Sequence, residues 1–181
     1  MKRRCLVAAV LVAASLIVVG VVFGAMTCVL KIQEIPGEST VSKHEGEIDI
    51  LAWSWGEAQA GTAGRSAGTA VKGAGKVQFQ EFAFTMYLNK ASVNLVKYCA
   101  SGQPLKSAVL TCMKSGGKAP VDFITFKLSN SVVSSYKTGT PSSADRFLDQ
   151  FSLMPVKVDM EYKMQRPDGT SGPSLSTTVG N

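Results

Sequence analysis

Strict two-residue alternation near the C-terminus is the feature that most constrains the fold of this chain. Apolar side chains occupy every second position, at Val156, Val158, Met160, Tyr162 and Met164, and polar side chains lie between them. Successive side chains of a β-strand point to opposite faces of a sheet, so this pattern predicts a strand with one apolar face. It forms the second half of a segment, residues 146–165, that we predict to be extended throughout.

Six further segments show strand patterns of the same kind, at residues 29–35, 47–55, 76–87, 108–113, 121–128 and 132–137. Apolar residues on both faces of the segment 76–87 predict a strand that is covered on both sides. Gly116 and Gly117 lie between two of the segments and supply the positive φ of a tight turn, which predicts a β-hairpin there.

Only one stretch changes to a helical period. Ser92, Leu95, Val96 and Cys99 recur at helical spacing, Asn89 or Ser92 could cap the start, and Gly102 could end the helix. Many strands around a single helix predict a mostly β fold. We expect a small antiparallel β-barrel or sandwich with one α-helix packed outside it or over one end.

The N-terminus predicts an export signal or a membrane anchor. Lys2, Arg3 and Arg4 precede an uncharged, apolar run over residues 5–26, which could direct export and be removed, or span a bilayer and be retained. We therefore divide the chain into residues 1–25 and a β domain at 26–181, which we expect to be secreted, periplasmic or anchored in the inner membrane. Translation from Met26 would instead give a protein that is cytoplasmic before secretion.

The charge and the cysteines exclude several classes of function. The net charge of +6 falls to +3 without the three basic residues at the start (6 − 3 = 3), so the composition gives little support for nucleic-acid binding. The cysteines match no metal-binding spacing, and we predict neither a metal site nor a cofactor. Cys99 and Cys112 could pair in an oxidising compartment, although two buried thiols are the favoured interpretation.

The search for catalytic chemistry gives no convincing site. Ser66 lies in a G-x-S-x-G match, but no strand leads directly into it, no helix follows it, and the only histidine, His44, precedes it. We expect His44 to make a structural hydrogen bond. Trp53 and Trp55 could stack on a sugar or a base, but core packing or a subunit contact is the favoured interpretation. The chain is therefore predicted not to be an enzyme.

A set of short motifs gives the chain a family resemblance. They are LKI at 30–32, IPGES at 35–39, KHEGEIDILAWSWG at 43–56, GKV at 75–77, FT at 84–85, KAS at 90–92, NL at 94–95 and CASG at 99–102. Together they resemble the Hcp family, the tube-forming proteins of the type VI secretion system. The resemblance covers most of the chain from Met26 to about Asp168.

This resemblance implies a small β-barrel that forms hexameric rings. In the family the rings stack into a tube that is driven by a contractile sheath, capped by a spike protein and able to carry small effectors. The alternative is an exported or membrane-tethered binding module that keeps the fold without forming a tube. The polar tail 170–181 departs from the family because it is predicted to lack a closing strand, which could weaken the rings.

A glycine-rich segment at 57–75 is the candidate stacking site. It has neither strand nor helix periodicity, which predicts a long loop. Such a loop could order against the next ring, and we expect it to make the axial contacts between rings. The residues assigned to this role are Glu57, Gly61, Gly64, Gly68, Gly73 and Gly75.

Overall fold

The computed structural model describes residues 26–59, 77–116, 119–140, 145–166 and 170–180 of the chain. In chain order the elements are β1 (Met26–Ile32), β2 (Ile48–Ile50), β3 (Ala52–Ser54), β4 (Glu57–Gln59), β5 (Val77–Phe79), β6 (Phe82–Tyr87), α2 (Lys90–Ser101), β7 (Leu105–Gly116), β8 (Ala119–Gly139), β9 (Leu148–Met154), β10 (Lys157–Gln165) and β11 (Ser171–Gly180). The prediction of a mostly β fold with one helix is thus confirmed over these ranges.

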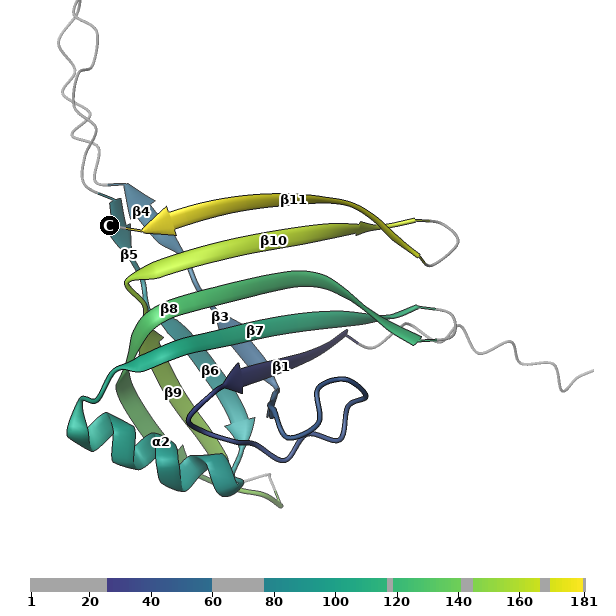
Figure 1. Ribbon diagram of the computed structural model, residues 1–181. Coiled ribbons are helices and arrows are strands. Elements are labelled where there is room, and N and C mark those ends of the chain that lie inside the picture. The colour runs from purple at the N-terminus through teal and green to yellow at the C-terminus, as the bar shows by residue number, and fades with distance from the viewer. Residues whose placement is uncertain (1–25, 60–76, 117–118, 141–144, 167–169, 181) are drawn as a thin grey trace, which may run out of the picture.

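Nine strands form one antiparallel sheet, in which β8 belongs to two layers (Figure 1). The first part of β8 pairs with β7 and β10, and its last part pairs with β9. Asn130 lies where the partner changes and has a φ of 51°, in the left-handed region that Asn tolerates better than most residues. The predicted strands at 121–128 and 132–137 are therefore two halves of one bent strand.

The predicted closed barrel is not confirmed. The sheet follows the order β2-β1-β7-β8-β9-β6-β3, and its end strands β2 and β3 do not pair with each other. They are consecutive in the chain and are separated only by Leu51, whose N–H bonds to the carbonyl of Thr85 beside β3. Curvature brings the two ends of the sheet together through the chain itself rather than through a ladder of hydrogen bonds.

The long C-terminal segment differs from prediction in two places. Residues 146–165 form two strands, β9 and β10, which are interrupted at Pro155 and Val156, because proline has no N–H to donate to a ladder. The tail that was expected to lack a closing strand contains β11, which pairs with β10 from Lys157–Gly180 to Gln165–Ser171. Local sequence gave no sign of β11, since its strand character depends on the partner β10.

Helix α2 begins and ends at the residues that its sequence indicates. Asn89 is the N-cap: its side chain accepts a hydrogen bond from the N–H of Ala91, while Ser92 Oγ accepts one from the N–H of Asn89. Gly102 ends the helix with a φ of 62°. Ala91, Ser92 and Leu95 are buried, whereas Val96, which was predicted to share the apolar face, is exposed. Within the ranges described, no helix has the length and apolar character that a membrane crossing requires.

The core lies between the two layers and under α2. Its largest buried side chains are four phenylalanines, Phe82, Phe84, Phe126 and Phe151, each at most 3% exposed. The rings of Phe84 and Phe151 stack with centroids 5.1 Å apart across the β6–β9 pair. The prediction that residues 76–87 are covered on both sides is wrong for β6: Phe82, Phe84 and Met86 are buried on one face, whereas Ala83 and Tyr87 on the other face are exposed.

A disulfide joins β1 to β7, which corrects the prediction for the cysteines. Cys28 and Cys112 are direct partners in the β1–β7 register and are bonded with their Cα atoms 4.1 Å apart. Cys99 lies on α2 and is free, so Cys99 and Cys112 do not pair, and Cys112 is not a core thiol. Sequence could not reveal this pair, because its members are 84 positions apart in the chain and only the strand register brings them together.

Candidate assembly surfaces

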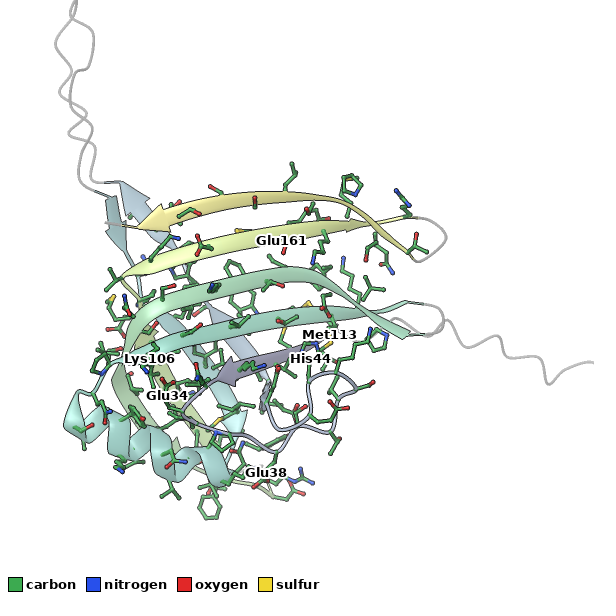
Figure 2. The ribbon with its side chains drawn as sticks, viewed as in Figure 1. Glu34, Glu38, His44, Lys106, Met113 and Glu161 are labelled. Atoms are coloured by element: carbon green, nitrogen blue, oxygen red, sulfur yellow. A yellow bond between two sulfur atoms is a disulfide. The ribbon has the colours of Figure 1, made fainter. Side chains whose placement is uncertain are left out.

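The sole histidine has the structural role that was expected of it. Residues 37–47 fold back on themselves through bonds from Gly37 N–H to Gly46 O (2.7 Å) and from Ser39 N–H to Glu47 O (2.9 Å). A side chain at Gly37 would collide with the Glu47 carbonyl, so this close approach requires glycine. The fold-back presents His44 to the sheet near Met113 of β7 (Figure 2).

His44 lies between two carboxylates on either side of its ring. Nδ1 is 3.0 Å from Glu47 Oε2, and Nε2 is 3.6 Å from Asp122 Oδ1 on β8. The carboxylates lie against different ring nitrogens and do not converge on a common point. No group of three potential metal ligands occurs among the described residues. Ser66 lies outside those residues, so its relation to His44 is not described.

The two tryptophans pack against the core, as the favoured interpretation held. Trp55 stacks on Phe82 with ring centroids 4.9 Å apart, and Trp53 meets Phe126 edge-on at 5.1 Å. Both rings are partly buried, while Leu51, which alternates with them along the predicted strand 47–55, is 49% exposed. Paired indole rings are therefore not available as an open stacking platform.

Of the residues assigned to the stacking loop, the structure describes only the first. Glu57 begins β4 and is exposed, and β4 pairs with β5 at Glu57–Phe79 and Ala58–Gln78. Residues 57–59 are thus strand rather than loop. Gly61, Gly64, Gly68, Gly73 and Gly75 lie outside the described residues. The β4–β5 pair forms a sheet separate from the main one and stands at one end of it (Figure 1).

An uncovered apolar surface continues the core along β10. Exposure rises along one face of this strand, from 1% at Val158 to 38% at Tyr162 and 48% at Met164. Tyr162 lies directly opposite Leu175 of β11, which is 69% exposed. We call Tyr162, Met164 and Leu175 the apolar strip. It lies on the face of the sheet that buries Phe126 further along, because Phe126 pairs with Met160.

The opposite face of the same hairpin is polar and balanced in charge. Lys157 Nζ lies 2.9 Å from Asp159 Oδ1, and Lys163 Nζ lies 3.5 Å from Glu161 Oε2. Thr178 of β11 donates a 2.5 Å hydrogen bond to Asp159. This bond, with the neighbouring Lys157, lowers the pKa of Asp159. Figure 2 shows Glu161 on β10, within this polar set.

One edge of the sheet is unpaired along its last strand. Within the described sheet β11 pairs only with β10, so its outer row of N–H and C=O groups has no strand partner. Natural proteins commonly guard such an edge with charged side chains. Residues 171–180, SGPSLSTTVG, contain no charged residue, and Pro173 is the only proline.

A second exposed apolar group surrounds the start of α2. Leu88, Val93 and Phe147, which we call the helix-end patch, are 51%, 75% and 59% exposed. Leu88 N–H bonds to the carbonyl of Phe147 at 3.1 Å. Leu88 and Val93 flank the N-cap at the spacing of a hydrophobic staple. Helix α2 and strand β11 lie at opposite ends of the molecule (Figure 1).

A buried carboxylate fixes the helix beside this patch. Asp149 of β9 is fully buried and accepts a 2.5 Å hydrogen bond from Ser92 Oγ in the first turn of α2. Burial raises the pKa of Tyr136 to about 12, and the adjacent Asp149 carboxylate acts in the same direction. A negative charge near a helix N-terminus is favourable. The sequence pattern gives no sign of the buried Asp149, because its burial depends on the packing of α2 against the sheet.

Comparison with known proteins gives one consistent result. The model of the family described as "Type VI secretion system effector, Hcp" matches residues 29–162. Protein hcp1 of Pseudomonas aeruginosa is 38% identical over 140 residues, which are 77% of this chain and 85% of that protein.

Solved structures agree with this match. One, described as the structure of a type six secretion system protein, is 25% identical with a TM-score of 0.79 and covers 86% of this chain and 96% of its own. Hcp1 from Salmonella typhimurium is 25% identical with a TM-score of 0.68, over 86% of this chain and 94% of its own. The chain belongs to the Hcp family of type VI secretion system proteins.

Proposed function

We propose that this chain is a ring subunit of a type VI secretion tube, with six copies in each ring and the rings stacked end to end. Hcp proteins are secreted tube proteins that form ring oligomers. The observation that carries the proposal is the family match over residues 29–162, which spans α2 and nearly every strand of the main sheet. A role in assembly also agrees with the structural roles of His44, Trp53 and Trp55, which hold the fold together in the part of the chain that the structure describes.

The size of the particle in solution tests this proposal. Light scattering and electron microscopy of the purified chain should show ring-shaped hexamers. Stable monomers at all concentrations would contradict it and would favour the tethered binding module. A monomeric outcome would leave the family assignment intact, since that depends on sequence and fold.

We assign the axial contacts between rings to residues 57–75, including Glu57, Gly61, Gly64, Gly68, Gly73 and Gly75. The β4–β5 pair supports this, because it anchors both ends of the segment to each other and is separate from the main sheet. Replacing residues 60–76 by a short turn should leave rings intact and abolish tubes in electron micrographs. Unchanged tubes would exclude the assignment.

The partners implied for such a subunit are a spike protein at the tip, a contractile sheath around the tube and small effectors inside it. Co-purification of the hexamer with each candidate from the same secretion gene cluster tests them one at a time. Binding that requires the intact ring would support a role in the tube, and equal binding by monomers would support the binding-module alternative.

We further propose that residues 1–25 form an export signal or a membrane anchor. The Cys28–Cys112 disulfide supports exposure of the domain to an oxidising compartment, where such bonds persist. Mass spectrometry of the N-terminus in separate cell fractions tests this. A start at Met1 in membranes indicates an anchor, and a start near Ala25 outside the cytoplasm indicates a cleaved signal. A start at Met26 in the cytoplasm would exclude both.

A further inference from the structure

We propose that the Cys28–Cys112 disulfide is a redox latch, a bond that forms and breaks only while β1 is away from β7. The state of the latch then records the compartment in which the domain folded. This inference goes beyond the proposed ring and does not depend on it. It follows from the strand register, from the burial of the two cysteines and from the neighbours of β1.

The register brings the two sulfur atoms together. Cys28 is the third residue of β1 and lies directly opposite Cys112 in the antiparallel β1–β7 pair. The two residues are bonded, whereas Cys99, the other cysteine that the structure describes, lies apart from them on α2 and is free. Docking of β1 in this register is therefore the event that joins these two cysteines and no other described pair.

Burial protects the bond from reagents in solution. Cys28 is 6% exposed and Cys112 is fully buried, and both belong to the hydrophobic core. Thiol–disulfide exchange requires an attacking thiolate to reach one sulfur atom and form a mixed disulfide with it. The packing around the pair leaves no room for that approach while β1 is docked. Exchange must therefore wait until β1 opens.

The neighbours of β1 make such opening rare. The strand pairs with β7 along all seven of its residues and with β2 at three of them. Val29 and Leu30, which follow Cys28, are fully buried. Opening a buried strand in a core sheet costs nearly as much free energy as unfolding the domain. The latch therefore changes state during folding or unfolding rather than in the folded protein.

The reaction that closes the latch is exchange with a disulfide-bearing oxidant. A thiolate of one cysteine attacks the oxidant, forms a mixed disulfide and releases one thiol, and the second cysteine then displaces the other thiol. The pair thus loses two protons and two electrons, and the disulfide of the oxidant becomes two thiols. A domain that folds in an oxidising compartment closes as the disulfide, and one that folds in a reducing compartment closes as the dithiol.

This behaviour separates the two routes by which the chain can leave the cytoplasm. A chain that is exported before it folds meets an oxidant while β1 is still free, so it carries the bond. A chain that folds in the cytoplasm and is secreted in the folded state keeps two buried thiols, even after it reaches an oxidising medium.

The full-length chain, purified in detergent and refolded with excess reductant, tests the latch. After the reductant is removed, oxidised glutathione is added to one sample in buffer and to another in unfolding urea. Samples are quenched with acid at intervals, the free thiols are alkylated, and mass spectrometry of the cysteine peptides follows each residue. Cys99 is the internal control, because it is partly buried and unbonded.

We expect the free thiols of Cys28 and Cys112 to disappear at least about 100-fold more slowly in buffer than in urea, because only molecules with β1 open can react. Cys99 should react at rates that agree within about tenfold in the two solvents, since its reactivity depends on exposure that it retains in the folded domain. Circular dichroism verifies that the reduced chain is folded in buffer.

The reverse reaction tests the latch without requiring the reduced chain to fold. The oxidised, folded chain is treated with dithiothreitol, and the Cys28–Cys112 bond should persist in buffer and be lost rapidly in urea. Comparable rates in buffer and in urea, in either direction, would overturn the latch. The size of the particles formed by the unmodified chain is measured separately, so such a result would leave the proposed function standing.

Discussion

Two regions of this domain are built from the same kind of alternating strand, but the apolar face is buried in one region and exposed in the other. Around β6, β9 and α2, apolar faces are covered and even a carboxylate, Asp149, is buried and bonded. On the β10–β11 hairpin an equivalent apolar face lies open at Tyr162 and Leu175. Alternation therefore sets which face of a strand is apolar, and the element lying opposite decides whether that face is buried.

The largest difference should appear when one leucine in each region is truncated. Leu95 on α2 is fully buried, whereas Leu175 on β11 is 69% exposed. Leu95→Ala should lower the free energy of unfolding by about 2–5 kcal/mol, through lost burial and a cavity. Leu175→Ala should change it by less than about 0.5 kcal/mol in dissociated protein. Urea unfolding measures both, and equal effects would mean that the strip is covered within one copy.

The disulfide joins β1 to β7, which lie outside both regions, so its removal should weaken the domain as a whole. Cys28→Ala combined with Cys112→Ala should cost about 2–4 kcal/mol, because the unfolded chain regains the freedom of a long loop. Cys99→Ala on α2 is the matched control and should cost less, since that thiol is only partly buried and unbonded. Denaturant melts of the two variants make the comparison, and an undiminished midpoint in the double variant would contradict it.

Two hydroxyl–carboxylate hydrogen bonds of equal length, one in each region, allow a finer comparison. Ser92 donates to Asp149 in the interior and Thr178 donates to Asp159 at the surface, both at 2.5 Å. Ser92→Ala should cost about 1.5–3 kcal/mol, because it leaves a buried carboxylate without this donor and breaks the helix cap. Thr178→Ala should be nearly neutral, since water replaces the hydroxyl. A large loss of unfolding free energy in Thr178→Ala, but not in Ser92→Ala, would contradict this interpretation.

The smallest expected effect is a fall in the free energy of unfolding at alkaline pH, and it involves Tyr136. Burial raises its pKa from 10.0 to about 12 in the folded state. Below pH 10 the phenol is protonated in both states, and between pH 10 and 12 the unfolded state loses its proton first, so the free energy of unfolding falls as pH rises. Tyr136→Phe should remove this part of the decline and the last step of a spectrophotometric phenol titration. An unchanged titration would show that Tyr136 is not the late group.

Much of this fold follows from local sequence. The alternation at residues 156–164 defines β10, and the glycines at 116–117 mark the β7–β8 hairpin, whose register places Gly116 opposite Ala119. Asn89, Ser92 and Gly102 define the helix because capping is a matter of a few neighbouring residues. The family resemblance carried by short motifs is likewise confirmed.

Other features depend on partners that are distant in sequence. The stacking residues beyond Glu57 stay a prediction, and the apolar strip could not be recognised because an exposed apolar face and a buried one have the same sequence pattern.

The sequence by itself determined most of the strands, the helix with its caps and the apolar face of most elements, since these depend on side-chain chemistry over a few residues. Only the tertiary structure decided that Cys28 bonds to Cys112, that residues 171–180 form a strand and that Asp149 is buried. Each of these requires a partner brought from far along the chain by strand register. The same register leaves Tyr162 and Leu175 uncovered.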